Sequence, residues 1–343
     1  MLDDRKKTLL QADVLIVGAG VAGCTLAYLL ARAGRKAIIV EKLRMAEKDK
    51  LCGGVINDRG RALMDAIFGP QVLDELGAAH LDGMHVLYRG YDTHVACGPF
   101  RSLPRAQIDA YLLDNALSAG AVLLERRTVA GIDEAARTAV PINLETGAEE
   151  RISYGTLVAA DGALSSVRAL LTGRSPKTVA SLEAQTEPLA DGGRITQRVY
   201  PAIAGGCWHI PQGDAAVIGC LFFPEKSHEP VGDQRILLSA FADELGCSCG
   251  TLRGAPVPTG EDVCLKTPGG SFFAGDAAGL IEPSLGAGIH LALQSAYSIF
   301  RELAGIERYE DAMADEVARM KRSAEWVAGS YLRLGVAALR DSS

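Results

Sequence analysis

The chain has 343 residues, 48% of them hydrophobic, so it can bury a large core in one composite domain or in two. Its formal net charge is −7, from 35 Lys and Arg against 42 Asp and Glu, and no basic run alternates with aromatic residues. This balance argues against a nucleic acid partner.

The cysteines and histidines lack the spacing of a metal site. None of the eight cysteines forms a CxxC pair, and the six histidines contain no HxxxH or HExxH arrangement. We therefore expect no metal ion or iron–sulfur cluster. Scattered free thiols favour the reducing cytoplasm as the compartment.

The first predicted elements form a β-α-β unit. A strand over residues 13–17 leads through a glycine turn into a helix over residues 24–33, and a second strand over residues 36–40 ends in Glu41. Residues 14–31 carry no charge, but a strand, a turn and a helix cannot together span a bilayer. The sequence predicts no membrane helix here.

The middle of the chain continues this alternation of helices and strands. Residues 55–100 mix short strands with a helix, and residues 103–120 predict an amphipathic helix followed by a strand over residues 121–124. A hairpin-like pair near residues 137–154 leads into a buried strand over residues 157–160.

The pattern changes after residue 176. Strands near residues 195–200, 206–210 and 215–223 predict an antiparallel sheet. A strand over residues 271–274 then returns to the first domain, and a helix over residues 286–303 precedes a mostly helical end.

These elements predict an α/β fold. We expect a Rossmann-like domain with a parallel sheet, an inserted antiparallel-sheet substrate domain and a short helical C-terminal tail. The Rossmann-like domain, which the motifs described next identify as an FAD-binding domain, comprises residues 10–60, 101–175 and 258–305. The substrate domain comprises residues 61–100 and 176–257, and the tail residues 306–343.

The motif Gly18-Ala-Gly20-Val-Ala-Gly23 lies between the first strand and its helix. Gly18 makes the tight turn, Gly20 lets the backbone approach a pyrophosphate, and Gly23 lets the helix pack on the strand. The helix N-terminus attracts phosphates, and Glu41 would accept hydrogen bonds from ribose hydroxyls. The motif predicts a dinucleotide site but does not separate NAD from FAD.

Two later motifs favour FAD. Leu157-Val-Ala-Ala-Asp161-Gly162-Ala-Leu-Ser165 is a buried strand ending in an acid and a helix-opening serine, which is also compatible with a plain strand-to-helix turn. The segment from Gly275-Asp276 through Pro283 to Gly286-Ala-Gly288 suits close contact with a cofactor. Asp276 would bind a ribityl hydroxyl, and the amides of residues 286–288 would meet the flavin edge that gathers negative charge on reduction.

The three motifs, with Arg105-Ala-Gln-Ile-Asp109-Ala-Tyr-Leu between the first two, resemble the FAD superfamily of aromatic hydroxylases, flavin halogenases and geranylgeranyl reductases. The resemblance covers roughly residues 10–305 and implies that Arg105 lies by the FAD phosphates. A solvated arginine at a helix start is the alternative. The residues predicted to bind FAD are Gly18, Gly20, Val21, Ala22, Gly23, Glu41, Lys42, Cys52, Gly53, Arg105, Asp161, Gly162, Gly275, Asp276, Pro283, Gly286, Ala287, Gly288 and Ile289.

Two segments narrow the resemblance to geranylgeranyl reductases. Lys50-Leu-Cys52-Gly53-Gly54 is similar to their K-x-C-G-G loop, and Trp208-His-Ile-Pro211 is similar to their W-x-F-P strand. The resemblance implies that the loop passes close to the isoalloxazine and that the strand walls the substrate cavity. The predicted catalytic set is Cys52, Gly53, Gly54, Trp208 and Pro211, although a buried Cys52 would equally serve as a small hydrophobe.

A halogenase is disfavoured, because Gly206 replaces the first tryptophan of the halogenase signature and its lysine-bearing loop is not recognisable. The short C-terminal tail puts a lipid-sized cavity in doubt. In the predicted insert only His209 and Tyr200 stand out as candidates for acid chemistry. Its strands carry the apolar residues Val199, Ile203, Ile210, Val217 and Phe222.

The resemblance implies a cytoplasmic enzyme that saturates C=C bonds of a polyprenyl or similar apolar substrate with a hydride from N5 of reduced FAD. A transient electron donor is expected, either NAD(P)H or a ferredoxin-like carrier, because no second GxGxxG unit is present. A peripheral contact with a membrane surface stays open. The alternatives are an aromatic or polyketide monooxygenase and a flavin-free lipid-binding escort protein.

Overall fold

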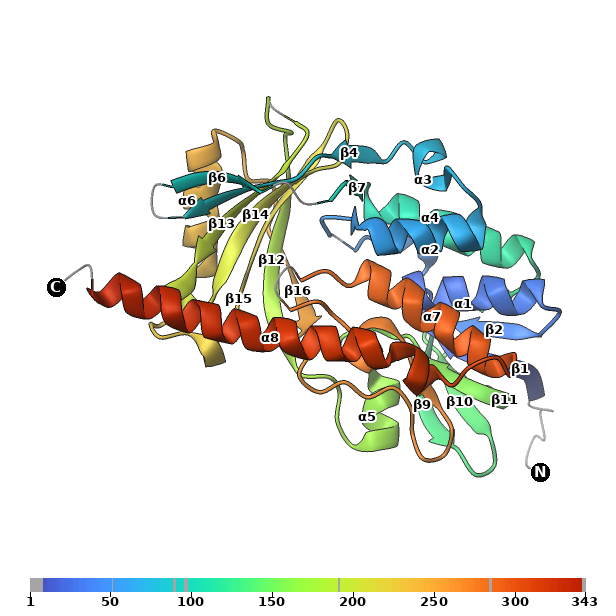
Figure 1. Ribbon diagram of the computed structural model, residues 1–343. Helices are drawn as coiled ribbons and strands as arrows, with labels where there is room; N and C mark the ends of the chain where they lie inside the picture. Colours follow the sequence, from blue (N-terminus) through green and yellow to red (C-terminus); the bar gives the residue numbers. More distant parts are fainter. Residues whose placement is uncertain are drawn as a thin grey trace.

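The computed structural model describes residues 9–50, 52–88, 91–95, 98–190, 192–283 and 286–340. Its first layer is a seven-stranded sheet with the order β8-β2-β1-β11-β10-β9, in which β17 also pairs with β11 (Figure 1). All pairs among β8, β2, β1, β11 and β17 are parallel, whereas β10 and β9 are antiparallel additions. The strands are β1 (Leu9–Val17), β2 (Ala37–Val40), β8 (Val122–Leu124), β9 (Arg127–Asp133), β10 (Thr138–Asn143), β11 (Arg151–Ala159) and β17 (Phe272–Phe273).

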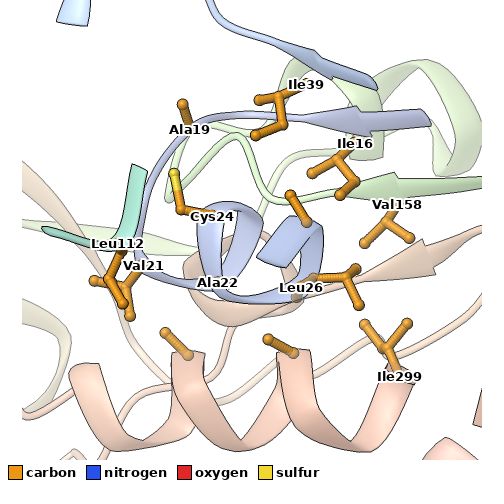
Figure 2. Close-up of a cluster of buried hydrophobic side chains, with 14 of the residues drawn as sticks. Ile16, Ala19, Val21, Ala22, Cys24, Leu26, Ile39, Leu112, Val158 and Ile299 are labelled. Carbon is orange, nitrogen blue, oxygen red and sulfur yellow. The ribbon is translucent and has the colours of Figure 1, made fainter. Parts of the chain in front are cut away.

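Three helices bury the apolar face of this sheet. They are α1 (Val21–Arg32), α4 (Arg105–Ser118) and α7 (Ile289–Leu303), and α1 packs against both of the others. Figure 2 shows Ile16 and Val158 of the central strands in one buried cluster with Leu26 of α1 and Ile299 of α7. Burial of these side chains fixes the loop between β1 and α1 at the carboxyl edge of the sheet.

A second sheet of seven strands has the order β16-β12-β15-β14-β13-β5-β6 and is antiparallel except for the β13–β5 pair. Helix α6 (Gln234–Leu245) packs on β14 and β15. The strands are β5 (Met84–Tyr88), β6 (Tyr91–Val95), β12 (Thr178–Thr186), β13 (Ile195–Tyr200), β14 (Gly205–Pro211), β15 (Ala216–Phe222) and β16 (Arg253–Pro258).

A small third sheet joins the two large ones. Its order is β3-β7-β4, and it lies beside helices α2 and α3 (Figure 1). The elements are β3 (Val55–Ile56), α2 (Asp58–Phe68), α3 (Val72–Glu75), β4 (Ala79–Leu81) and β7 (Phe100–Ser102). The 3-10 turns are η1 (Met45–Glu47), η2 (Pro201–Ile203), η3 (Pro224–Lys226) and η4 (Gly275–Ala278).

The remaining helices are α5 (Ser166–Thr172) and α8 (Tyr309–Arg340). Helix α8 begins against α7 and runs as one helix to η2 in the second sheet's region (Figure 1). The buried Tyr309 hydroxyl donates to the carbonyl oxygen of Phe273 at 2.9 Å, which ties the start of α8 to β17. Among the described residues, no helix is long and apolar enough to cross a membrane.

The predicted α/β fold with a parallel sheet and an antiparallel-sheet insert is confirmed. One expectation needs correction, because the hairpin near residues 137–154 and the strand over 157–160 share one strand, β11. The predicted helical tail is helix α8. Strands β12 and β16 and helix α6 were missed. Two prolines obscure β16 in the sequence, whereas residues 181–185 of β12 do alternate between polar and apolar side chains. The division into domains stays a prediction.

Candidate functional site

A cavity of about 660 Å³ lies where the carboxyl edge of the parallel sheet faces the second sheet. Its lining comes from distant parts of the chain: the β1–α1 loop, the Cys52 loop, the start of α4, the end of β11, the β17–α7 segment and the second sheet. All residues predicted to bind FAD line it except Gly23. A volume of this order is typical of small-molecule sites.

The three glycines of the β1–α1 loop differ in what a side chain would meet. A Cβ on Gly18, whose φ is +106°, would lie 2.2 Å from the carbonyl oxygen of Ala160, and a Cβ on Gly23 would lie 1.9 Å from that of Gly18. A Cβ on Gly20 would meet nothing within 4 Å. Gly18 and Gly23 therefore let the chain pack on itself, whereas Gly20 leaves the backbone open to the cavity beside the N-terminus of α1.

Glu41 ends β2 and is buried at the edge of the cavity. Its carboxylate accepts hydrogen bonds from the amides of Ala19 at 2.8 Å and Leu43 at 3.0 Å. Lys48, which sequence reasoning missed, lies 3.4 Å from the same carboxylate and also donates to the carbonyl oxygen of Ala19 at 2.6 Å. A carboxylate has about four acceptor positions, so Glu41 keeps capacity for a ribose hydroxyl.

Arg105 begins α4 and is buried with Asp109, 2.9 Å away. This rules out the alternative of a solvated arginine. Its Nε atom is buried and has no hydrogen-bond partner among the described residues. A buried charged donor without a partner is costly, and an anionic group in the cavity would satisfy it. The residue therefore fits the predicted phosphate of FAD.

Asp161 follows β11 and fits both interpretations of its motif, a strand-to-helix turn and a cofactor contact. Its carboxylate accepts from the Ser165 hydroxyl at 2.5 Å and the Val167 amide at 3.1 Å, while the Ser165 hydroxyl caps α5 by accepting from the Arg168 amide at 2.9 Å. Burial raises the pKa of Asp161, and these hydrogen bonds oppose the shift. Asp161 thus shapes the strand-to-helix turn and also lines the cavity.

Asp276 and Gly288 come together across the β17–α7 segment. A Cβ on Gly288 would lie 3.4 Å from Oδ1 of Asp276, and Oδ2 lies 3.1 Å from Nζ of Lys50. Gly288 is the N-cap of α7, so the first amides of that helix, which lack intrahelical partners, lie at the cavity wall. The arrangement fits a ribityl hydroxyl and an electron-rich flavin edge, and Lys50 adds a cation that sequence reasoning did not use.

The Cys52 loop lies against the second sheet. A Cβ on Gly53 would meet Cδ1 of Ile210 at 2.3 Å, so the loop backbone approaches β14 closely. The Gly54 amide donates to Sγ of Cys52 at 3.4 Å, and Gln212 donates to the carbonyl oxygen of Cys52 at 2.9 Å. The half-buried Cys52 lines the cavity, which is where a substrate-side thiol is expected.

The second sheet forms an apolar wall opposite the loop. Trp208 and Ile210 of β14 line the cavity, but Pro211 does not; its carbonyl oxygen accepts a hydrogen bond from the Ser102 hydroxyl. Of the apolar insert residues singled out from sequence, only Ile210 lines the cavity. His209 lies on the other face and bonds to the carbonyl oxygen of Glu187 at 2.9 Å. Tyr200 packs in the core beneath α6.

Sequence reasoning missed several residues of this wall. Ser181 and Glu183 line the cavity from β12. Residues two apart on a strand point to the same face, so recognising this strand in the sequence would have predicted that the two side chains lie together. The remaining lining side chains of the second sheet's strands that were not predicted include Met84, Ile195, Gln197 and Leu221.

The family model described as FAD binding domain matches residues 11–191, more than half of the chain. A digeranylgeranylglycerophospholipid reductase 2 of Methanothermobacter thermautotrophicus is 28% identical over 83% of this chain and 75% of its own length. A geranylgeranyl diphosphate reductase of Rhodobacter capsulatus is 28% identical over 82% of this chain and 72% of its own. A kynurenine 3-monooxygenase of Xanthomonas campestris is 28% identical over 62% of this chain and 52% of its own.

Solved structures agree on the fold. A geranylgeranyl bacteriochlorophyll reductase-like protein from Thermoplasma acidophilum superposes with a TM-score of 0.77 at 19% identity, covering 95% of this chain and 88% of that one. The flavin-dependent monooxygenase PieE superposes with a TM-score of 0.71 at 18% identity, covering 93% and 64%. The chain belongs to the FAD binding domain family and is an FAD-dependent oxidoreductase similar to geranylgeranyl reductases.

Proposed function

We propose that this oxidoreductase saturates C=C bonds in a polyprenyl or similar apolar substrate. The observation that supports the proposal most directly is the contact between the Cys52 loop and β14. Gln212 and Ile210 hold the loop against this strand, and Trp208 of the same strand lines the cavity. Two relatives that match more than four-fifths of the chain are named as geranylgeranyl reductases. Their names support a prenyl substrate.

The residues of the chain divide into two groups in this proposal. Gly20, Arg105 and Asp276 would hold the phosphate and ribityl parts of FAD, with the N-terminal amides of α7 at its ring. When bound, the cofactor would supply two electrons as a hydride to one carbon of the double bond.

Trp208, Ile210 and Leu221 would exclude water from the double bond and hold it in the apolar half of the cavity. Cys52 would contact the substrate side of the cofactor. No second dinucleotide-binding loop occurs in the described part of the chain, so a nicotinamide or a ferredoxin-like donor would dock transiently.

A monooxygenase is the second candidate, because kynurenine 3-monooxygenase is among the relatives. One experiment separates the two. The holoenzyme is reduced anaerobically and mixed with a geranylgeranyl lipid, a menaquinone or air, and products are analysed by mass spectrometry. A gain of two hydrogens without oxygen supports the reductase. A product that forms only with labelled O₂ and carries the label supports the monooxygenase.

A further inference from the structure

Glu183 is the only acid that the described strands of the second sheet contribute to the cavity wall. It lies on β12, two residues after Ser181, and both side chains line the cavity because a strand alternates its faces with a period of two. The rest of this wall is largely apolar. An ionised carboxyl group in such a place is costly unless it is paired, and otherwise tends to take up a proton.

Trp208 is its neighbour across the sheet. Glu183 stands opposite Gly219 in the β12–β15 register, and Gly219 stands opposite Trp208 in the β15–β14 register. A Cβ on Gly219 would lie 2.7 Å from each of three indole atoms, Nε1, Cε2 and Cζ2, so one face of the ring covers this glycine. No side chain therefore separates Glu183 from Trp208.

The hydrogen-bond donor of the indole is unsatisfied in this position. Its Nε1 atom is buried and has no hydrogen-bond partner among the described residues. Residues directly opposite on neighbouring strands have Cβ positions about 5 Å apart, and the indole reaches over the intervening glycine toward β12. Trp208 and Glu183 thus lie next to each other in the cavity wall, with the aromatic surface beside the carboxyl group.

Three cations lie near Glu183, but each has another carboxylate as its partner. Lys50 lies 3.1 Å from Asp276, Arg105 lies 2.9 Å from Asp109, and Arg253 lies 2.6 Å from Asp49. In the described part of the chain, Glu183 itself makes no salt bridge. Burial raises the pKa of Glu183 to about 7, and Lys50, Arg105 and Arg253 oppose the shift only in part. The carboxyl group therefore keeps a substantial protonated fraction near neutral pH.

We propose that Glu183 is the catalytic proton donor to the substrate double bond, with Trp208 beside it as the surface that stabilises developing positive charge. This inference rests on the proposed reductase function. It identifies a side chain of this protein as the source of the proton that the double bond takes up.

The step balances with one proton and one hydride. The double bond breaks its π bond, one carbon takes the Glu183 proton, and the other takes the hydride and its two electrons from the cofactor. The Glu183 carboxylate then takes a proton from solvent. In a trisubstituted prenyl double bond, proton addition gathers positive charge on the more substituted carbon, which the face of a tryptophan attracts.

The test compares Glu183→Gln with Glu225→Gln, which removes an exposed carboxyl from η3. Holoenzymes with matched FAD content are reduced anaerobically and mixed with a geranylgeranyl lipid. We expect Glu183→Gln to slow saturation about a hundredfold or more, in the range of general acid catalysis. The wild-type rate should fall as pH rises through about 7, a decline absent from Glu183→Gln but retained by Glu225→Gln.

A second readout does not depend on turnover. Infrared difference spectra of the wild-type holoenzyme between pH 5 and pH 9 should contain a protonated carboxyl band that Glu183→Gln lacks and Glu225→Gln keeps. The absence of any band specific to Glu183 would overturn the inference.

The outcomes separate the two proposals. If the wild type saturates the lipid and Glu183→Gln does so within about threefold at every pH, the proton donor is not Glu183, and the reductase function stands. If the wild type saturates no member of a panel of prenyl lipids and quinones, the proposed function fails, and proton delivery by Glu183 falls with it.

Discussion

Nε2 of Gln212 donates a hydrogen bond of 2.9 Å to the carbonyl oxygen of Cys52. Gln212 follows the last residue of β14, so this bond joins the second sheet to a loop that follows the first β-α-β unit. It fixes the position of a cysteine between the predicted cofactor residues and the apolar wall. The loop and the wall therefore act as one unit.

Gln212→Met should loosen this loop. It removes one part-buried hydrogen bond, which lowers the free energy of unfolding by about 1 kcal/mol, and it should speed alkylation of Cys52 by a thiol reagent. Alkylation is followed by peptide mass spectrometry. Gln107→Met, on the exposed side of α4, is the matched control and should change neither value. Equal Cys52 reactivity in all three proteins would remove the role given to Gln212.

Gly20→Val should weaken FAD binding, whereas Gly23→Ala should lower the stability of the fold. A Cβ on Gly20 meets no protein atom within 4 Å, so the valine variant should fold normally but bind FAD about tenfold or more weakly. A Cβ on Gly23 would lie 1.9 Å from the Gly18 carbonyl oxygen, so the alanine variant should lose roughly 1–3 kcal/mol of stability. Thermal unfolding and FAD titration measure both effects, and normal FAD affinity in Gly20→Val would displace the predicted pyrophosphate site.

Cys52→Ala should retain FAD but react slowly with substrate. The side chain lines the cavity. Alanine removes the weak bond from the Gly54 amide to Sγ but keeps the bond from Gln212 to the carbonyl oxygen of residue 52, so the loop should stay in place. Flavin content is read from the absorption spectrum, and anaerobic reoxidation by a prenyl substrate gives the rate. An unchanged rate at saturating substrate would leave Cys52 with a packing role only.

Glu183→Gln should change the pH dependence of stability in the FAD-free protein. Because the folded-state pKa of Glu183 is raised to about 7, the folded chain holds its proton where the unfolded chain, with a pKa of about 4.3, releases it. Wild-type stability is therefore lost as pH rises between these values. The variant should gain in Tm relative to wild type across this window and keep a constant advantage above it. Parallel Tm curves would show an ordinary pKa.

Asp262→Asn should destabilise the fold strongly. Asp262 lies 3.0 Å from the buried guanidinium of Arg168, whose side chain is 1% exposed. Removing the partner leaves a buried charge uncompensated, which costs roughly 3–5 kcal/mol. Glu307→Gln breaks the half-exposed pair with Arg301 and should cost less than about 1 kcal/mol. Denaturant unfolding distinguishes the two, and similar midpoints would contradict the assignment.

The sequence by itself determined the parts of the site that lie on neighbouring residues. Gly18, Gly20 and Gly23 belong to one strand, turn and helix, so local periodicity and the steric limits of a tight turn were enough to predict their conformation. The same holds for Asp161, whose strand, turn and capped helix are read within a few residues. The position of Arg105 by the cofactor was implied by the resemblance of its segment to a known family, and its pairing with Asp109 was not predicted.

Only the tertiary structure decided which residues of the second sheet face the cavity. Strands β14 and β15 are almost wholly buried on both faces, so their sequences carry no alternation that tells one face from the other. Shifting a strand by one residue exchanges every side chain between the faces. The resemblance had implied that Trp208 walls the cavity, but only the register of β12, β15 and β14 places Glu183 beside it and turns His209 away.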